Sequence, residues 1–395
     1  MPKRVESERP RRICIDLSLC EMFDRHGGIA RYGAHLLREL PRLPGADPSR
    51  VTFWATTEAH RPPLPAEEAL AWLEDPGPEV KMRVHEFRRR WRMPWQLRRA
   101  GVDVLHAIDP NLLPIGGPFA TVATCHDVIP LVLQPPKMSD KRHAKLRREE
   151  KRRFAGVDHI LADTENTRRD AMRELGIPAE RISVVPLGVD ASSFARPDIP
   201  LAPPRWKLPE RYFVSVGSDY YRKNQKRLVE AWASVAELIP EGLVLVGRPL
   251  YDSTFEALER EMRRRRLDDR FVWLRDVEDG ELPGLYHSAT AAVAPSLYEG
   301  FGLTILEAMA AGTPVMACAN GAYEEVAGDA ALYFEGESTA GIAERLVRVS
   351  EDAACRAELV RLGAERVERF SWRATAKATW RVYEGILWPR DVGPA

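Results

Sequence analysis

Short apolar, β-branched runs alternate with longer segments of helical periodicity along most of the chain. The runs in the first half are ICIDLSL, VTFWAT, VDVLHAI, ATVATCHDVIP, HILADT and ISVVPLGV. Those in the second half are FVSVGS, LVLVG, FVWLRDV, ATAAVAPS, PVMACA and AALYF, each followed by an amphipathic stretch such as KRLVEAWASVAELI. Strand and helix alternating twice over predict an α/β fold with two parallel sheets, each covered by helices on both faces.

The alternation is interrupted at residues 190–212, where five prolines replace hydrophobic periodicity. A chain of 395 residues is also too long for one core, so we expect two domains. We predict a Rossmann-like, doubly wound domain over residues 1–195 and a second over residues 196–370. Residues 371–395 read as an amphipathic helix and tail that pack back towards the N-terminal domain.

Charge, the first residues and the cysteines argue against nucleic acid binding, secretion, and disulfide or zinc sites. Lysine and arginine number 58, as do aspartate and glutamate, so overall charge gives no reason to expect nucleic acid binding. The start of the chain, MPKRVESERPRR, lacks the apolar core of a signal peptide, which predicts a cytoplasmic protein. The five cysteines are scattered without paired spacing, so we expect buried free thiols and neither disulfides nor a zinc site.

Two segments concentrate arginine and lysine with few acids between them, residues 83–99 and 137–153. Such runs are most often solvated faces. The first also interleaves Phe87, Trp91 and Trp95 with its arginines, a composition typical of segments that settle on an anionic bilayer. The sequence thus allows peripheral association with the inner face of the membrane through residues 83–99, with a solvated face as the alternative.

The segment APSLYEGFGLTILEAMAAGTPVMA, residues 294–317, carries the strongest chemical signal. It begins as a strand, breaks, and resumes as a helix near Gly302. In open parallel sheets ligands bind where strands end, and a helix start offers unpaired N–H groups to an anion. Here those groups belong to Gly302, Leu303 and Thr304, while the absence of side chains at Gly300 and Gly302 lets a bulky phosphate approach.

Two carboxylates flank this predicted phosphate site. Glu299 precedes the helix, and Glu307 lies on its second turn. An ionised glutamate only accepts hydrogen bonds, so the pair suits sugar and ribose hydroxyls, which donate them. The alternative is an ordinary strand-helix turn in which Glu299 favours the helix dipole and Glu307 is solvated.

With this motif the chain resembles family 4 of the retaining glycosyltransferases. That family's signature is two glutamates separated by seven residues, which this sequence matches with Glu299-GFGLTIL-Glu307, followed by AMAAGTPVMA. Other landmarks of the family occur in order: HGGIARYGAHLLREL, CHDVIP, DTENTRRDAMRELGIPAERISVVPLGVD and VSVGSDYYRKNQKRLVEAW. The resemblance implies a GT-B fold, in which two Rossmann-like domains face a central cleft. The HDVIP and RKN patterns look like bacterial mannosyltransferases of surface polysaccharide synthesis.

The resemblance also implies how a nucleotide diphosphate sugar is bound. Glu299 would contact hydroxyls of the donor sugar, Glu307 the ribose, and the N–H groups from Gly302 to Thr304 the diphosphate. Gly300 and Phe301 would belong to the same donor-binding loop. Val277 lies in WLRDVE, where members of the family recognise the base.

A second group of predicted site residues lies in GSDYYRKNQKRL, where a strand ends at Gly217. Fixed cations stabilise the charge that develops on a departing diphosphate. Lys223 matches the family's phosphate-binding lysine. A second cation often follows the glycine directly, where this chain has Ser218, so we expect Arg222 to supply the missing charge. Without the carboxylate motif, a solvated Arg-Lys pair would be the default interpretation.

The N-terminal half contributes a glycine pair and two histidines. Gly27 and Gly28 precede a helix, and by resemblance their loop closes over the donor, although a plain turn fits as well. His126, at the end of an apolar strand, matches a histidine that lines the family's cleft near the transferred sugar. His106 ends a neighbouring strand and reads as an acceptor-site or structural residue.

These residues predict a retaining hexosyltransferase, with mannose slightly favoured, acting on a hydroxyl of a glycan or lipid-linked acceptor. The donor would be GDP-mannose or a UDP-sugar, and no further cofactor is expected. The sequence has no Asp-x-Asp motif, which predicts catalysis without a divalent metal. Three alternatives stay open: a sugar-nucleotide epimerase or a phosphorylase on the same fold, and a non-catalytic glycan- or nucleotide-binding subunit of a polysaccharide assembly complex.

Overall fold

The computed structural model describes residues 9–17, 28–47, 50–56, 64–68, 93–109, 117–134, 138–195, 204–248, 252–278 and 280–389. The chain forms two compact units. Unit 1 consists of residues 1–132, 139–188 and 372–395, and unit 2 of residues 133–138 and 189–371. The main division therefore falls at 188/189, where the sequence pattern suggested 195/196, and the last segment from residue 372 onward belongs to unit 1.

Unit 1 is built on a seven-stranded sheet with the order β3-β2-β1-β4-β5-β6-β7. All its pairings are parallel except that of the short β3 with β2. The strands are β1 (Arg11–Asp16), β2 (Val51–Thr56), β3 (Leu64–Pro65), β4 (Val104–Ala107), β5 (Ala120–Cys125), β6 (His159–Ala162) and β7 (Ile182–Val184).

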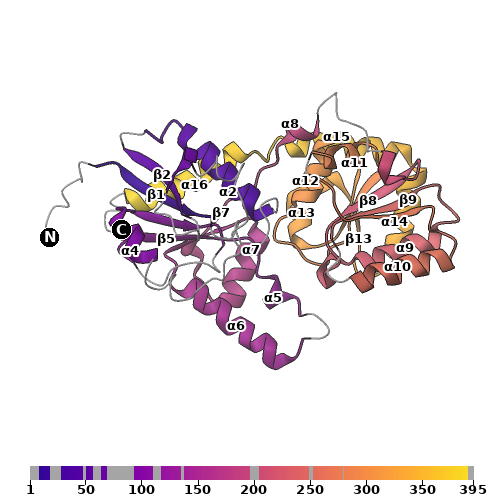
Figure 1. Ribbon diagram of the computed structural model, residues 1–395, viewed down its shortest axis with the longest axis horizontal. Coiled ribbons are helices and arrows are strands. Elements are labelled where there is room, and N and C mark those ends of the chain that lie inside the picture. Colours follow the sequence, from indigo (N-terminus) through magenta and orange to yellow (C-terminus); the bar gives the residue numbers. More distant parts are fainter. Residues whose placement is uncertain are drawn as a thin grey trace. The chain divides into compact units, whose positions relative to one another are not determined.

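Helices cover both faces of this sheet (Figure 1). They are α2 (Gly28–Glu39), α4 (Met93–Arg99), α5 (Ile129–Val132), α6 (Asp140–Ala155), α7 (Glu165–Asp170) and α16 (Trp372–Leu387). Buried residues of α5, α6 and the segment after α7 pack on one face of β5, β6 and β7. Helix α16 packs beside α2, where the ring of Trp372 stacks on that of His35 with centroids 4.4 Å apart.

Unit 2 contains a six-stranded, all-parallel sheet with the order β10-β9-β8-β11-β12-β13. Its strands are β8 (Tyr212–Val216), β9 (Gly242–Val246), β10 (Phe271–Leu274), β11 (Ala291–Ala294), β12 (Val315–Cys318) and β13 (Ala331–Phe334). Every residue of β9 is buried, as expected for a parallel strand with helices on both faces. The predicted doubly wound α/β architecture is confirmed in both units.

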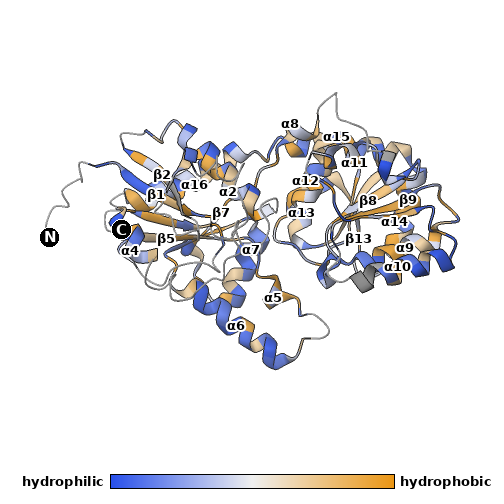
Figure 2. Cartoon of the chain, in the orientation of Figure 1, coloured by the Kyte–Doolittle hydropathy of each residue, from blue (hydrophilic) through white to orange (hydrophobic). Residues whose placement is uncertain are grey.

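The helices of unit 2 form two layers around its sheet. They are α8 (Ala191–Phe194), α9 (Gln225–Val235), α10 (Asp252–Arg264), α11 (Leu282–His287), α12 (Leu303–Ala310), α13 (Gly321–Ala327), α14 (Thr339–Glu351) and α15 (Ala353–Val367). Buried residues of α9, α10 and α14 share one core with all six strands. Hydrophobic residues accordingly concentrate on the strands, and the outer faces of helices such as α10 are hydrophilic (Figure 2).

Side-chain caps fix several helix starts at the positions that the sequence favours. The oxygens of Thr164, Asn320, Ser338 and Asp352 each accept a hydrogen bond from the backbone N–H three residues further on.

The described cysteines Cys14, Cys125, Cys318 and Cys355 are free thiols, the first three of them buried. No helix among the described residues is both long and apolar enough to cross a bilayer.

Candidate active site

The strand order of unit 2 brings two loops together at one end of the sheet. From β8 the chain continues outward to β9 and β10, whereas β11, β12 and β13 extend the sheet on the other side of β8. The carboxyl ends of β8 and β11 therefore flank a topological switch point, the usual place for a ligand in such a sheet. The loop after β8 carries Arg222 and Lys223, and the loop after β11 carries Glu299.

Asn224 and its neighbours link these two loops by hydrogen bonds. Asn224 is buried, its φ is +54°, and its side-chain amide donates hydrogen bonds to the carbonyls of Pro295 (3.2 Å) and Gly336 (2.8 Å). The backbone N–H of Leu297 also donates to the carbonyl of Arg222 at 2.7 Å. No site role was predicted for Asn224 from the sequence, where the RKN tripeptide was the available signal for it.

Glu299 lies between the two predicted cations. Its Oε1 is 2.8 Å from a guanidinium nitrogen of Arg222 and 2.7 Å from Nζ of Lys223. Its side chain is 12% exposed. Burial favours the neutral acid, but Lys223 and Arg222 outweigh it and hold the pKa of Glu299 below its ordinary value. The three side chains thus form one charged cluster with a net positive charge, which suits an anionic ligand.

The start of α12 completes this end of unit 2. Gly302 precedes the helix with φ +117°, and a Cβ there would lie 2.7 Å from Cε1 of the buried Tyr323. Only glycine meets both conditions without strain. Because the first N–H groups of a helix have no partner within it, those of Leu303 and Thr304 are available for caps or ligands. Tyr323, which sequence reasoning missed, therefore shapes the turn that presents them.

The remaining predicted donor residues occupy different positions in unit 2. Glu307 lies on α12 and is only 2% exposed, so it is not the solvated carboxylate of the alternative interpretation. Gly300 and Phe301 are buried, and the Phe301 ring meets that of Phe370 edge-on. Ser218 is half-buried directly after Gly217, and Val277 is half-buried beyond the end of β10.

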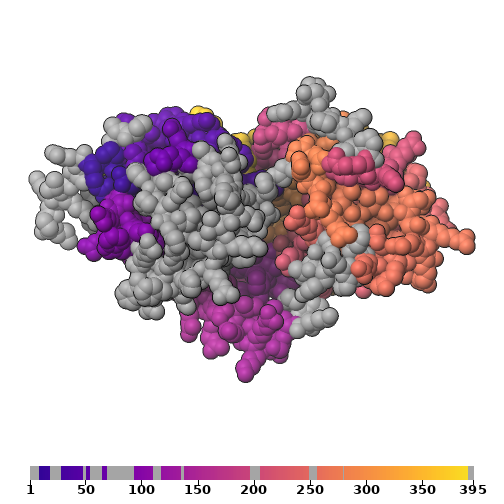
Figure 3. Space-filling view, in the orientation of Figure 1, coloured from indigo at the N-terminus to yellow at the C-terminus, as the bar shows by residue number. Residues whose placement is uncertain are grey.

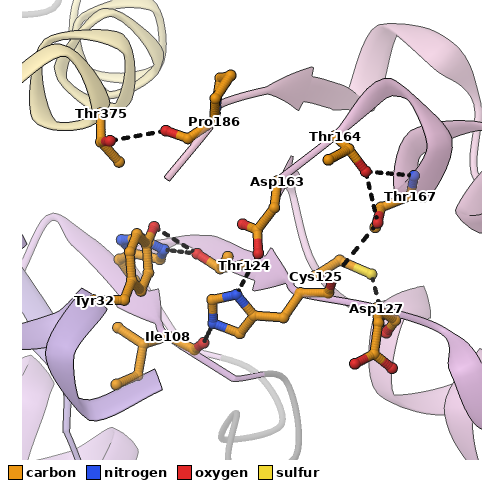
Figure 4. Close-up of polar contacts among 12 residues, drawn as sticks. Tyr32, Ile108, Thr124, Cys125, Asp127, Asp163, Thr164, Thr167, Pro186 and Thr375 are labelled. Atoms are coloured by element: carbon orange, nitrogen blue, oxygen red, sulfur yellow. Dashed lines mark hydrogen bonds and ion pairs between the residues drawn. The ribbon is translucent and has the colours of Figure 1, made fainter. Parts of the chain in front are cut away.

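In unit 1, His126 follows β5 and is held by groups from two neighbouring strands (Figure 4). Its Nδ1 is 2.7 Å from a carboxylate oxygen of Asp163, which follows β6, and its Nε2 is 2.9 Å from the carbonyl oxygen of Ile108, which follows β4. The ring of Tyr32 meets the imidazole edge-on at 5.2 Å. Sequence reasoning missed Asp163, whose only signal was an acidic residue ending an apolar run.

Both nitrogens of His126 thus face acceptors, an arrangement that suits the doubly protonated imidazolium. Burial alone lowers the pKa of this histidine, but the carboxylate of Asp163, helped by Asp109 and Asp127, raises it to about 9. The ring is therefore cationic at neutral pH.

His106 has a different environment. It is fully buried, with Nδ1 2.6 Å from the Tyr383 hydroxyl and Nε2 2.8 Å from the Thr124 hydroxyl. Burial and the neighbouring His126 charge lower its pKa to about 3, so it is neutral. Tyr32 also bonds Thr124, at 2.8 Å (Figure 4). His106 thus joins β4 and β5 to α16, which supports the structural interpretation over the acceptor-site one.

The glycine pair is only partly described. Gly28 is the first residue of α2, whereas His26 and Gly27 lie outside the described residues. Asp127 caps a turn after β5, because the N–H of Ile129 donates to its carboxylate at 3.0 Å. Among the described residues, no three histidine, cysteine or acidic side chains gather as metal ligands.

Comparison with solved structures defines the fold. The structure of Anabaena HepE in complex with UDP and glucose is similar to this chain, with a TM-score of 0.71 and 16% sequence identity. The match covers 95% of this chain and 100% of the HepE chain. Two doubly wound units of this kind make up the GT-B fold of glycosyltransferases.

Sequence models then identify the family. The model for glycosyltransferase family 4 matches residues 26–193, and that for glycosyl transferases group 1 matches residues 201–366. The chain belongs to the family 4 type of glycosyltransferases.

Two bacterial mannosyltransferases are among its relatives. O-antigen chain mannosyltransferase B of Escherichia coli is 28% identical over 304 residues, covering 74% of this chain and 77% of the relative. MMP alpha-(1->4)-mannosyltransferase of Mycolicibacterium hassiacum is 28% identical over 405 residues, covering 91% and 95% respectively.

Proposed function

We propose that this glycosyltransferase moves a hexosyl group, with retention of anomeric configuration, from a nucleotide diphosphate sugar to a hydroxyl of a glycan or lipid-linked acceptor. The observation that carries the proposal is the cluster in which Glu299 lies between Arg222 and Lys223 beside the start of α12. The cluster combines cations for a diphosphate with an acceptor for sugar hydroxyls.

The diphosphate leaves with its negative charge matched by Lys223, Arg222 and the first N–H groups of α12. The bond from the anomeric carbon to the phosphate oxygen breaks, and the acceptor hydroxyl attacks from the same face. Its proton passes to the departing phosphate oxygen, so no protein nucleophile is required. Glu299 orients the donor sugar, and Glu307 binds the ribose. Gly300, Phe301, Ser218 and Val277 line the donor site.

In this proposal His126 contributes a fixed positive charge rather than a mobile proton. Both of its ring nitrogens are within hydrogen-bond distance of groups in unit 1. Proton transfer to substrate would require breaking one of these contacts. Gly28, the first residue of α2, is assigned to donor binding as well.

The two mannosyltransferase relatives support mannose as the transferred sugar, and we take GDP-mannose as its donor. The HepE structure contains UDP, so UDP-sugars are the matched comparison. The test is incubation of the purified chain with GDP-mannose, UDP-glucose and the free nucleoside diphosphates. We expect transfer or slow donor hydrolysis, and a rise in melting temperature, since a ligand at a hundred times its Kd stabilises a fold by about 2.7 kcal/mol. Stabilisation without turnover on any donor and acceptor tested would instead indicate a non-catalytic binding subunit.

The reaction is expected to need no divalent metal, because lysine, arginine and a helix start neutralise the diphosphate in this proposal. Activity in excess EDTA should equal activity with added Mg²⁺ or Mn²⁺. Loss of turnover in EDTA that either ion restores would show that metal-free catalysis is wrong.

We also propose that unit 1 attaches to the inner face of the membrane. Residues 83–92 of the predicted basic segment lie outside the described residues, but residues 93–99 form α4, where Trp95 is 58% exposed beside the exposed Arg98 and Arg99. The second basic segment is mainly α6, which lies on the surface in magenta in Figure 3.

Vesicle binding tests this attachment. We expect the chain to sediment with phosphatidylglycerol vesicles at about 0.1 M salt and to be released at about 1 M, where charge interactions are screened. Replacing Trp95, Arg98 and Arg99 together should reduce sedimentation. A wild-type chain that stays in solution at low salt would contradict the proposal.

A further inference from the structure

A groove of about 510 Å³ lies in unit 1, between the edge of its sheet and α16. This volume is within the range of about 300–1,000 Å³ that is typical of small-molecule sites. Strands β6 and β7 contribute His159, Ser183 and Val184, the residue after β7 is Val185, and the helix contributes Ala378, Arg381, Val382, Gly385 and Ile386. No residue assigned above to the donor site or to the glycine loop lines it.

The sheet presents polar groups in this groove because side chains alternate along a strand. Ile160 and Ile182 pack into the core under α6, so His159 and Ser183, their neighbours in β6 and β7, face the opposite side. His159 Nε2 is 2.9 Å from the Ser183 hydroxyl. Burial, reinforced by the charge of Arg181, lowers the pKa of His159, so its ring is neutral at pH 7. The pair supplies uncharged hydrogen-bonding groups.

Helix α16 presents a second face to the groove, separate from the one that packs on α2. Ala378, Arg381, Val382, Gly385 and Ile386 follow the spacing of one helical face. Gly385 is the informative position. A glycine inside a helix costs about 1 kcal/mol relative to alanine, yet a Cβ at this position would meet nothing within 4 Å. This position therefore opens onto the groove, and no neighbouring atom would block a larger side chain there.

Arg381 gives the groove its charge. Its side chain is exposed and makes no ion pair with the described residues. The apolar surface comes from Val185, Val382 and Ile386. A complementary ligand therefore needs an apolar body and a negative head, since a lone guanidinium beside apolar walls favours an anion that can accept its N–H groups.

We propose that the groove between β7 and α16 binds an amphiphile with a single hydrocarbon chain and an anionic head group. The chain lies against Val185, Val382 and Ile386, across the space left open by Gly385, and the head accepts hydrogen bonds from Arg381. The proposal does not depend on the transferase activity, because the groove and the donor site share no residue.

Calorimetric titration with dodecyl phosphate, kept below its critical micelle concentration, tests the proposal. Dodecyltrimethylammonium and dodecyl maltoside have the same chain with a cationic or neutral head, and ethyl phosphate keeps the head without the chain. We expect saturable binding of dodecyl phosphate and at least tenfold weaker binding of the other three. Dodecanoate distinguishes two sources of the anion: binding as tight as that of dodecyl phosphate indicates a carboxylate or a phosphate, and weaker binding indicates a lipid phosphate.

Two substitutions connect the binding to this groove. Gly385→Leu fills the open space and should abolish binding, and Arg381→Gln should weaken it about tenfold through loss of a charge-assisted hydrogen bond. Lys377→Gln, an exposed cation of α16 outside the groove lining, is the matched control and should bind normally. Absence of dodecyl phosphate binding to the wild type, equal binding of the three head groups, or normal binding by a folded Gly385→Leu chain would overturn the proposal. A nucleotide-dependent thermal shift, measured on every variant, reports on the donor site separately.

Discussion

Lys223→Ala and Glu299→Ala are each expected to lower the turnover number by at least a hundredfold, with the melting temperature unchanged. Removing one pre-organised group that stabilises developing charge typically costs about 10²–10³ in rate. Lys223 contacts the carboxylate of Glu299 at 2.7 Å and lies beyond the carboxyl end of β8 rather than in the core. Its removal should therefore leave the fold intact.

Lys226→Ala is the matched control for Lys223. This lysine is on α9, is 80% exposed, and pairs with Glu230 one turn further along the same helix. An exposed pair of this kind contributes about 0–1 kcal/mol to stability, so the rate should stay at the wild-type level. Near-normal turnover in Lys223→Ala or Glu299→Ala would contradict the role in sugar transfer proposed for that residue.

A further measurement separates the role of Glu299 from that of Lys223. In the free protein the Glu299 carboxylate pairs with both cations that the proposal assigns to the diphosphate. Glu299→Gln removes this competing negative charge. We expect the variant to bind GDP or UDP at least as tightly as the wild type while it transfers sugar slowly. Loss of nucleotide binding in a folded Glu299→Gln chain would show that the carboxylate organises the site instead.

Among these substitutions, replacement of Asp163 should lower the free energy of unfolding the most. Asp163 is 2% exposed and is the ionic partner of His126, whose side chain is 15% exposed. Removing one member of a buried pair leaves an unpaired charge, at a cost of about 3–5 kcal/mol. Asp163→Asn keeps the shape of the side chain and is the variant with which to study pH dependence, whereas Asp163→Ala should melt at a much lower temperature.

The sign of the pH dependence follows from the pKa of His126. The folded-state pKa is about 9, above the ordinary value of 6.5. The stabilising contribution is therefore complete below pH 6.5 and is lost as the pH rises through 9. Wild-type stability should fall by about 3 kcal/mol over this interval from this group alone.

Melting curves between pH 6 and 10, with NMR titration of the His126 ring, measure this effect. In Asp163→Asn the fall should be absent. Asp158→Asn is a suitable control, because the Asp158 carboxylate accepts hydrogen bonds from Thr121 rather than from a histidine. It should lower the melting temperature without changing the pH dependence. Equal pH dependence in the wild type and Asp163→Asn would mean that Asp163 does not hold the charge of His126.

Local patterns were sufficient for most of the architecture. Buried parallel strands such as β9 require continuous apolar runs, and the helices between them require a 3.6-residue period, so the two doubly wound units were readable from the chain. The pair Glu299 and Glu307 could also be recognised from local sequence, because both residues belong to one strand-helix segment. The boundary between the units was harder to predict, because α8, which belongs to unit 2, lies within residues 190–212, where the sequence has no hydrophobic periodicity.

The residue types proposed for the donor site and their order along the chain follow from the sequence, because each group lies within one short loop. Which groups meet depends on how the strands are ordered in the folded sheet. Arg222 and Lys223 reach Glu299 because β8 and β11 are neighbours although 74 residues lie between them in sequence. His126 becomes an imidazolium because Asp163 and Ile108 arrive from the strands on either side. A residue's charge state depends on what surrounds it in space, and no local pattern records those neighbours.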